Sequence, residues 1–174
     1  MAKIFKKLAG INKKLGKNAK FSEVVDPKKI QEAEATASRL QTFFMQAIAD
    51  DFKEFRRVLE RMKANNVTNR EYNKIYDLSF SIKSRAGNAG IALASKVSNS
   101  LYRFCDTVLT SNFPINGYDV IKVHFHALEQ IFTAKFDIEN TQKSLQLLQG
   151  LETLCEKVIK DANPNPEPEP EAAA

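Results

Sequence analysis

Apolar residues recur at helical spacing through most of the chain, and this pattern limits the fold class more than any other feature. From residue 30 to residue 158 they return every three or four positions, which places them on one face of a helix. No segment shows the period of two that a half-buried strand requires, and no internal repeat is visible. The sequence therefore predicts an all-α bundle of antiparallel helices joined by short links.

Capping residues mark the starts of the first two helices. Asp26-Pro27 predicts a helix of about 38 residues that ends at Asn65-Asn66, with a bend near Asp50-Asp51. Thr68 and Glu71 form a capping-box pattern at the start of the second helix. The two apolar stripes consist of Ile30, Ala33, Ala37, Leu40, Phe44, Ala47, Ile48, Phe52, Phe55, Val58, Leu59 and Met62, and of Ile75, Leu78, Ile82 and Ala86.

Three further helices are expected after the segment Gly87–Gly90, which loosens or ends the second one. Ser111–Pro114 is a connection, and Asn140 or Thr141 caps the last helix. The three stripes consist of Ile91, Leu93, Ala94, Val97, Leu101, Phe104, Cys105 and Val108; of Val120, Ile121, Phe125, Leu128, Ile131, Phe132 and Phe136; and of Leu145, Leu148, Leu151, Cys155 and Val158.

The charge divides the chain into a basic arm at residues 1–25, a bundle at 26–162 and a Pro/Glu tail at 163–174 that is expected to be disordered. The arm has no acid before residue 21 and carries Lys3, Lys6, Lys7, Lys13, Lys14, Lys17 and Lys20. Because the formal net charge is +5, the other residues sum to −2, and no nucleic-acid partner is expected. The arm either contacts an anionic membrane surface or docks its apolar residues onto the bundle.

Several function classes are disfavoured. No apolar run approaches the roughly 18 residues of a membrane span, and the start lacks a signal-peptide core. We therefore expect a cytoplasmic protein, either free or peripheral at the inner membrane face. Cys105 and Cys155 are predicted to be reduced packing residues, and with two His they lack zinc-site spacing. No phosphate loop, His-Glu-x-x-His or nucleophile elbow is present, so neither an enzyme nor a cofactor is predicted.

One aromatic residue lies on the polar side of its predicted helix. At about 100° per residue, Phe80 falls about 155° from the middle of the apolar stripe around Leu78. It should point outward among Asn73, Tyr76, Asp77, Lys83 and Ser84. A single exposed Phe is common and indicates nothing by itself.

The run Phe80-Ser81-Ile82-Lys83-Ser84, with Gly90 ten positions after Phe80, resembles the motif of the histidine phosphotransfer (HPt) domain family. That motif is His-x-Leu-Lys-Gly followed by a distal small residue. Two positions depart from it, since Phe80 replaces the phosphoacceptor His and Ser84 the first Gly. Asp26-Pro27, and Ile121 three positions before His124, also resemble alphaproteobacterial HPt-like proteins, and the similarity spans residues 8–136.

The resemblance implies a four-helix bundle with additional helices and a docking face for a response-regulator receiver domain or a histidine kinase. Phe80 has no ring nitrogen, so the phosphoryl transfer step should be lost, and Ser79, Ser81 and Ser84 lack an activating base. The predicted partner-binding face consists of Asn73, Tyr76, Asp77, Phe80, Lys83, Ser84 and Gly87.

Several alternatives stay open. Phe80 could be covered by the arm or by a second protomer of a homodimer, or the protein could be an adaptor that uses only its basic arm. His126 is predicted to face outward with Glu129 where a phosphate-contacting Lys belongs, and His124 to border the core.

Overall fold

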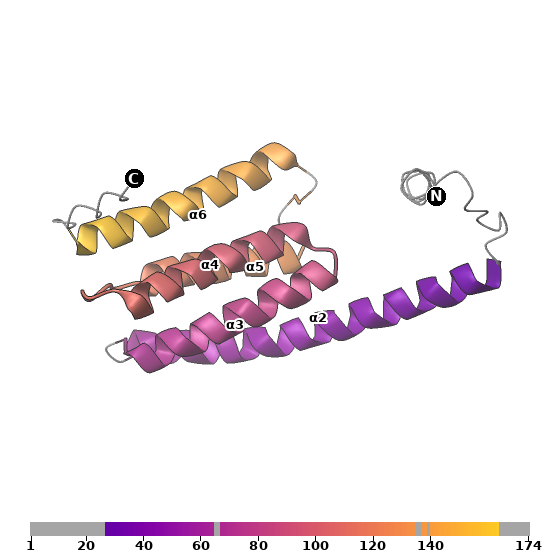
Figure 1. Ribbon diagram of the computed structural model, residues 1–174, viewed down its shortest axis with the longest axis horizontal. Coiled ribbons are helices and arrows are strands. Elements are labelled where there is room, and N and C mark those ends of the chain that lie inside the picture. Colours follow the sequence, from indigo (N-terminus) through magenta and orange to yellow (C-terminus); the bar gives the residue numbers. More distant parts are fainter. Residues whose placement is uncertain (1–26, 65–66, 135–136, 139, 164–174) are drawn as a thin grey trace, which may run out of the picture. The chain divides into compact units, whose positions relative to one another are not determined.

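The computed structural model describes residues 27–64, 67–134, 137–138 and 140–163, and in this part of the chain all regular structure is helical (Figure 1). The helices are α2 (Pro27–Ala64), α3 (Asn69–Asn88), α4 (Ala92–Thr110), α5 (Tyr118–Phe132) and α6 (Thr141–Ala162). The prediction of an all-α bundle is confirmed. Contacts divide the chain into two compact units, residues 1–38 and 39–174. The predictions for residues 1–26, for Asn65-Asn66 and for residues 164–174 lie outside the described residues.

The second unit is a bundle of antiparallel neighbours. Between α2 and α3, Arg85 donates to the carbonyl of Ala47 at 3.1 Å and Ser81 donates to Asp51 at 2.9 Å. Because the residue numbers rise on one helix as they fall on the other, the two helices are antiparallel. The same holds for α3 with α4, for α4 with α5 and for α5 with α2. Helix α6 packs against α4 and α5 as a fifth element.

Aromatic side chains fill the centre where α2 meets α5. The rings of Phe55 and Phe125 stack with centroids 4.5 Å apart, and Phe52 meets Phe125 edge-on at 5.4 Å. Such ring pairs contribute about 1 kcal/mol beyond their buried area. The predicted stripe of α3 (Ile75, Leu78, Ile82 and Ala86) is buried throughout, as is that of α2 from Ile48 onward.

The predicted helix starts are confirmed where the structure describes them. Thr68 accepts from the backbone N–H of Arg70, and the Glu71 carboxylate accepts from the Thr68 N–H at 3.3 Å, which completes the capping box. The side chain of Asn140 caps α6 by accepting from the N–H of Lys143 at 3.0 Å. These bonds satisfy backbone donors that would otherwise have no helical partner.

Two predictions of burial are wrong, one on α6 and one on α2. Leu145 is 49% exposed, because α6 lies against the outside of α4 and α5 and buries fully only Leu151 and Cys155. On α2, Ile30 and Leu40 are 42% and 51% exposed rather than buried. Helix α5 ends at Phe132, and the backbone turns at Ala134, where φ is +54°. The prediction for Phe136 lies outside the described residues. The predicted bend position at Asp50-Asp51 lies within the single helix α2.

The turn between α3 and α4 requires a left-handed residue, and Gly90 supplies it with φ +82°. The N–H of Gly90 donates to the carbonyl of Gly87, and the N–H of Ile91 donates to the carbonyl of Ala86 at 2.8 Å. These bonds close the end of α3 and start α4 in the opposite direction.

Two glycine substitutions should have opposite effects on stability. Gly90→Ala should lower the free energy of unfolding by about 1 kcal/mol, because an L residue is strained at this φ. Gly87→Ala should keep or raise it, because Gly87 is helical and an added Cβ would lie 3.5 Å from the Ser95 hydroxyl, an ordinary contact. Urea unfolding followed by circular dichroism measures both, and equal losses would contradict this account of the turn.

Candidate docking surface

Phe80 lies on the solvent side of α3, as the sequence predicts. Its side chain is 54% exposed, while Leu78, Ser79 and Ile82 on the same turns are buried. Helical periodicity explains this arrangement, since Phe80 falls opposite the stripe that packs into the bundle. The described part of the chain does not cover the ring.

Phe80, Tyr76 and Lys83 gather around Tyr102, and we call Tyr76, Phe80, Lys83 and Tyr102 the aromatic surface. The Tyr102 ring, from α4, lies 4.4 Å from the Tyr76 ring and 5.8 Å from the Phe80 ring. The Lys83 ammonium lies 5.2 Å from the centre of the Tyr102 ring, within cation–π range. The aromatic surface therefore joins three rings and one cation from two helices.

A hydrogen bond ties the tyrosines together. The hydroxyl oxygens of Tyr76 and Tyr102 are 2.5 Å apart. This bond, more than any other influence, raises the pKa of Tyr76 to about 12, so the phenol stays neutral at physiological pH. The half-buried Tyr76 and Tyr102 thus form a fixed platform beside the more exposed Phe80.

The partner-binding face predicted from the sequence omits Tyr102. The register of the α3–α4 hairpin, counted from its turn, identifies this residue. The α3–α4 turn centres on Ala89-Gly90, so antiparallel packing brings residues together whose numbers sum to about 178. Tyr76 and Tyr102 obey this rule, as do Lys83 and Ser95, whose hydroxyl donates to the Lys83 carbonyl at 3.0 Å. The register of the α3–α4 hairpin therefore predicts that Tyr102 lies beside Tyr76.

The remaining predicted face residues are exposed, and they extend along α3 on both sides of Phe80. Asn73 and Asp77 lie toward the start of the helix, and Ser84 and Gly87 lie toward its end. Gly90, the distal small residue of the motif, belongs to the turn, and its backbone conformation accounts for the glycine.

The neighbouring serines offer no replacement for a histidine acceptor. Ser79 is fully buried. Ser81 donates its hydroxyl to Asp51, which also pairs with Arg85. Ser84 is exposed on the surface of α3. A hydroxyl needs an adjacent base to act as a nucleophile near neutral pH. The Asp51 carboxylate beside Ser81 is neutralised by Arg85, and no His of the described residues contacts these serines.

His126 is exposed and has an acidic neighbour. Its Nδ1 lies 4.0 Å from the carboxylate of Glu129, which also accepts from the guanidinium of Arg56 at 2.6 Å and 3.0 Å. A phosphoryl group on His126 would lie beside this carboxylate. The HPt motif has a Lys at the position that Glu129 occupies here, and the nearby Arg56 guanidinium is already paired with this carboxylate.

His124 is fully buried and hydrogen-bonded on both ring nitrogens. Nδ1 lies 2.9 Å from the carbonyl oxygen of Val120, which can only accept, so Nδ1 carries the proton. Nε2 then accepts from the Ser100 hydroxyl at 3.1 Å, and the Cys155 sulfur lies 4.0 Å away. Burial lowers the pKa of His124 to about 4 and raises that of the Cys155 thiol to about 11. His124 is neutral at physiological pH, and Cys105 and Cys155 are buried and unpaired, as predicted.

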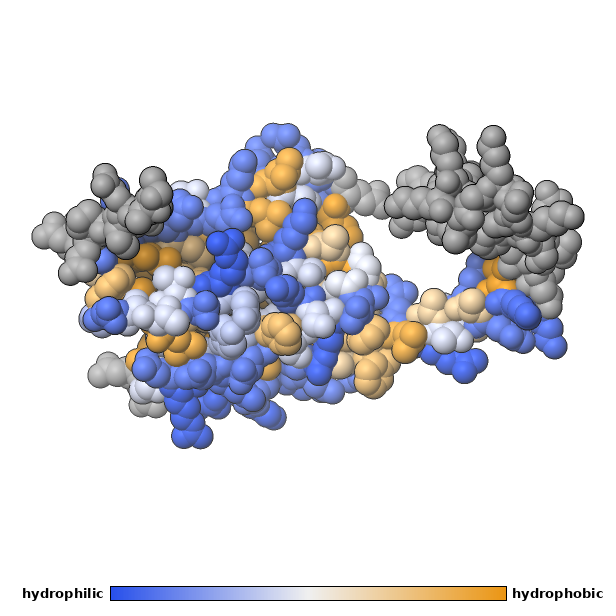
Figure 2. Space-filling model, viewed as in Figure 1, coloured by the Kyte–Doolittle hydropathy of each residue, from blue (hydrophilic) through white to orange (hydrophobic). Residues whose placement is uncertain are grey.

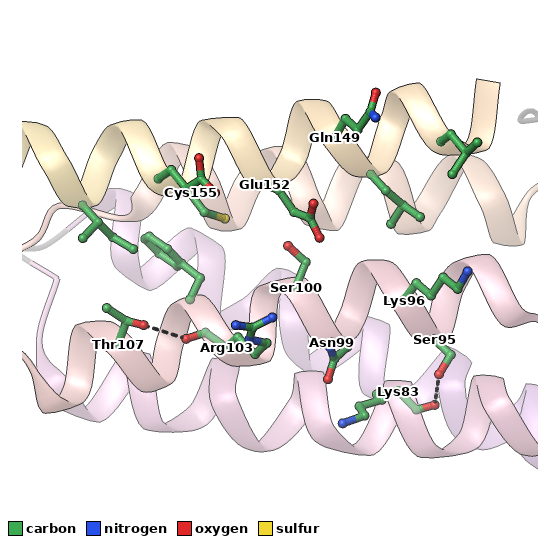
Figure 3. A pocket seen from close by; sticks show the side chains of 15 residues that line it. Lys83, Ser95, Lys96, Asn99, Ser100, Arg103, Thr107, Gln149, Glu152 and Cys155 are labelled. Atoms are coloured by element: carbon green, nitrogen blue, oxygen red, sulfur yellow. Dashed lines mark hydrogen bonds between the residues drawn. The ribbon is translucent and has the colours of Figure 1, made fainter. Parts of the chain in front are cut away.

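A groove of about 960 Å³ runs between α4 and α6 (Figure 3). Lys96 and Arg103 line its α4 wall, Glu152 and Glu156 its α6 wall, and Lys83 links it to the aromatic surface. Cations and carboxylates face each other across it. The groove therefore presents no field of one sign to a ligand.

Comparisons of the chain with protein-family models, curated proteins and solved structures found no match. Among the described residues, no group of three or more His, Cys, Asp or Glu could hold a metal ion, and no helix has the length and apolar character to cross a membrane. The functional argument therefore rests on the motif around Phe80 and on the geometry of the aromatic surface.

The buried His124 should make stability depend on pH. Its folded pKa of about 4 lies below the ordinary value of 6.5, so the unfolded chain binds the proton more tightly. This contribution is complete above pH 6.5 and is lost as the pH falls from 6.5 toward 4. Between pH 7 and pH 4.5 the free energy of unfolding should drop by about 2 kcal/mol.

Urea titrations at several pH values test this prediction. His124→Gln should lower stability at pH 7 and flatten the dependence between pH 7 and 4.5. The matched control is His126→Gln, at an exposed position of the same helix, and it should leave the dependence unchanged. A steep dependence that survives in His124→Gln would contradict the assignment.

Proposed function

We propose that the chain is a degenerate histidine phosphotransfer protein that binds a receiver domain or a histidine kinase without accepting phosphate. The observation that carries the proposal is Phe80 itself. It occupies the phosphoacceptor position of the HPt-like run, and its side chain is 54% exposed on the outer face of an α-helical hairpin. The retained Lys83 belongs to the same surface.

The aromatic surface has the composition of a protein-binding centre. Interface centres are enriched in aromatic residues, and a few such side chains carry most of the binding energy. The bond between Tyr76 and Tyr102 holds the platform in one arrangement before binding, which reduces the entropy lost on association. Phe80 would then enter the space where an HPt histidine approaches the receiver's aspartate, with Lys83 available to a carboxylate.

Substitution of Phe80 should abolish partner binding. In an affinity pull-down from native lysate read by mass spectrometry, the wild type should enrich a receiver-containing protein or a histidine kinase, and Phe80→Asp should not. With the purified partner, Phe80→Asp should raise Kd by roughly 30-fold or more, as expected for a hot-spot aromatic residue.

The matched control is Val123→Asp, which places the same charge at a 44% exposed apolar position on α5. It should leave Kd unchanged. Equal weakening by Phe80→Asp and Val123→Asp, or recovery of the same non-signalling proteins by wild type and Phe80→Asp, would contradict docking through the aromatic surface.

A second candidate function is an adaptor at an anionic membrane surface, favoured by the seven lysines and no acid in residues 1–20. Such contacts contribute about 1 kcal/mol for each basic residue near the membrane and weaken with salt. If the arm alone carries the function, binding to phosphatidylserine vesicles should vanish on deletion of residues 1–20. It should also vanish in roughly 0.5 M NaCl, because salt at that concentration shortens the Debye length well below the about 10 Å that it has at 0.1 M. Vesicle binding through the arm should persist in Phe80→Asp. Partner docking through the aromatic surface should instead survive deletion of residues 1–20 and be lost in Phe80→Asp.

A further inference from the structure

The groove between α4 and α6 is lined by a serine whose hydroxyl contacts a histidine. Ser100 is half-buried, and its Oγ lies 3.1 Å from Nε2 of the fully buried His124. The protonated Nδ1 of the same ring donates to the Val120 carbonyl oxygen at 2.9 Å, so Nε2 accepts from the Ser100 hydroxyl. Two hydrogen bonds therefore connect a hydroxyl, a neutral imidazole and the carbonyl that orients the imidazole. A hydroxyl held in this way is activated as a nucleophile.

A second serine of the groove lacks this arrangement. Ser95 lies on the same helix and also lines the groove, but its hydroxyl donates to the backbone carbonyl of Lys83 at 3.0 Å. A carbonyl oxygen does not remove a hydroxyl proton near neutral pH, whereas a neutral imidazole can take it. In the part of the chain that the structure describes, Ser100 is the serine that contacts a histidine. Ser95 therefore provides an internal comparison in the same groove.

We propose that Ser100 is a nucleophile that accepts an acyl group from an activated ester bound in the groove, an activity independent of partner docking through the aromatic surface. The Ser100 oxygen attacks the carbonyl carbon of the ester while the hydroxyl proton moves to Nε2 of His124. The bond between the carbonyl carbon and the leaving oxygen then breaks, and the proton passes from Nε2 to that oxygen. The products are an acylated Ser100 and a free alcohol, and His124 is neutral again.

The lining of the groove favours an uncharged ester with an apolar acyl group. Lys96 lies one turn before Ser100 and Arg103 one turn after it on the same side of α4, so both cations are available to the carbonyl oxygen as negative charge develops there (Figure 3). Glu152 and Glu156 on the opposite wall disfavour an anionic substrate. Figure 2 shows hydrophobic and hydrophilic residues mixed over α4 and α6. Apolar contacts for an acyl chain come from Phe104, Leu145, Leu148 and Ile159.

A fluorophosphonate probe tests whether Ser100 is activated, because it phosphonylates nucleophilic serines with loss of fluoride. The full chain would be incubated with the probe, and the labelled residues and their rates measured by peptide mass spectrometry. Ser100 should react faster than Ser95 by roughly 100-fold, the lower end of what a general base contributes, since burial makes His124 a weaker base. Ser100→Ala should abolish this label, and the matched control Ser95→Ala should retain it. Equal rates at the two serines, no label on Ser100, or label on Cys155 instead would overturn the proposal.

The pH dependence of ester cleavage tests whether His124 is the base. The Ser100-dependent release of p-nitrophenol from p-nitrophenyl butyrate, taken as wild type minus Ser100→Ala, should be constant between about pH 6 and pH 8, because His124 stays neutral there. Cys155, which faces Nε2 from α6 at 4.0 Å, also stays neutral with a pKa of about 11. The other ionisable residues lining the groove are Lys, Arg and Glu, whose ordinary pKa values lie outside this range.

A rate that rises in proportion to the hydroxide concentration would mean an unassisted hydroxyl and would overturn the role of His124. His124→Gln should abolish the Ser100-dependent rate in a chain that circular dichroism shows to be folded. A folded His124→Gln chain that keeps this rate would equally overturn the proposal. Because the pH profile is measured on the wild type, it decides the question even where His124→Gln fails to fold.

Discussion

The antiparallel packing of α3 against α4 sets the position of every side chain on the aromatic surface. The left-handed backbone of Gly90 closes the turn, and the buried stripe of α3 fixes the rotation of that helix about its axis. With the turn and the rotation fixed, Tyr102 lies beside Tyr76 and Phe80 projects outward from the same two helices. The surface is therefore a product of the hairpin rather than of a mobile loop, and rigid elements present a binding surface with little loss of entropy.

The other helices of the second unit pack against this hairpin. The aromatic contacts of α2 with α5 fill the core, and Arg85 ties α3 to the Asp51 carboxylate and the Ala47 carbonyl of α2. Helix α6 adds less, since only Leu151 and Cys155 are buried on it and a groove remains along α4. The two histidines also differ in kind: His124 is a neutral core residue, and His126 is an exposed residue beside a carboxylate.

The sequence predicts the structural features that depend on a single helix. Periodicity identified the buried stripe of α3 and the exposed side chain of Phe80, and local capping chemistry identified Thr68 and Asn140. The failures concern contacts between elements. Leu40 and Leu145 have helical spacing like that of any core residue, and only the placement of neighbouring helices decides that they stay exposed. Tyr102 was missed for the same reason, although the turn centre at Ala89-Gly90 gives the register that pairs it with Tyr76.

The central claim is that the aromatic surface is an HPt docking surface whose acceptor has been lost, and a phosphoryl transfer assay tests it most directly. A receiver-containing partner recovered with the wild type would be phosphorylated and mixed with the wild type and with Phe80→His, and acid-labile phosphate on each chain would be measured. The account predicts no label on the wild type and label on Phe80→His, because the substitution supplies the missing ring nitrogen beside Lys83. Label on the wild type, or none on a Phe80→His chain that still binds the partner, would contradict it.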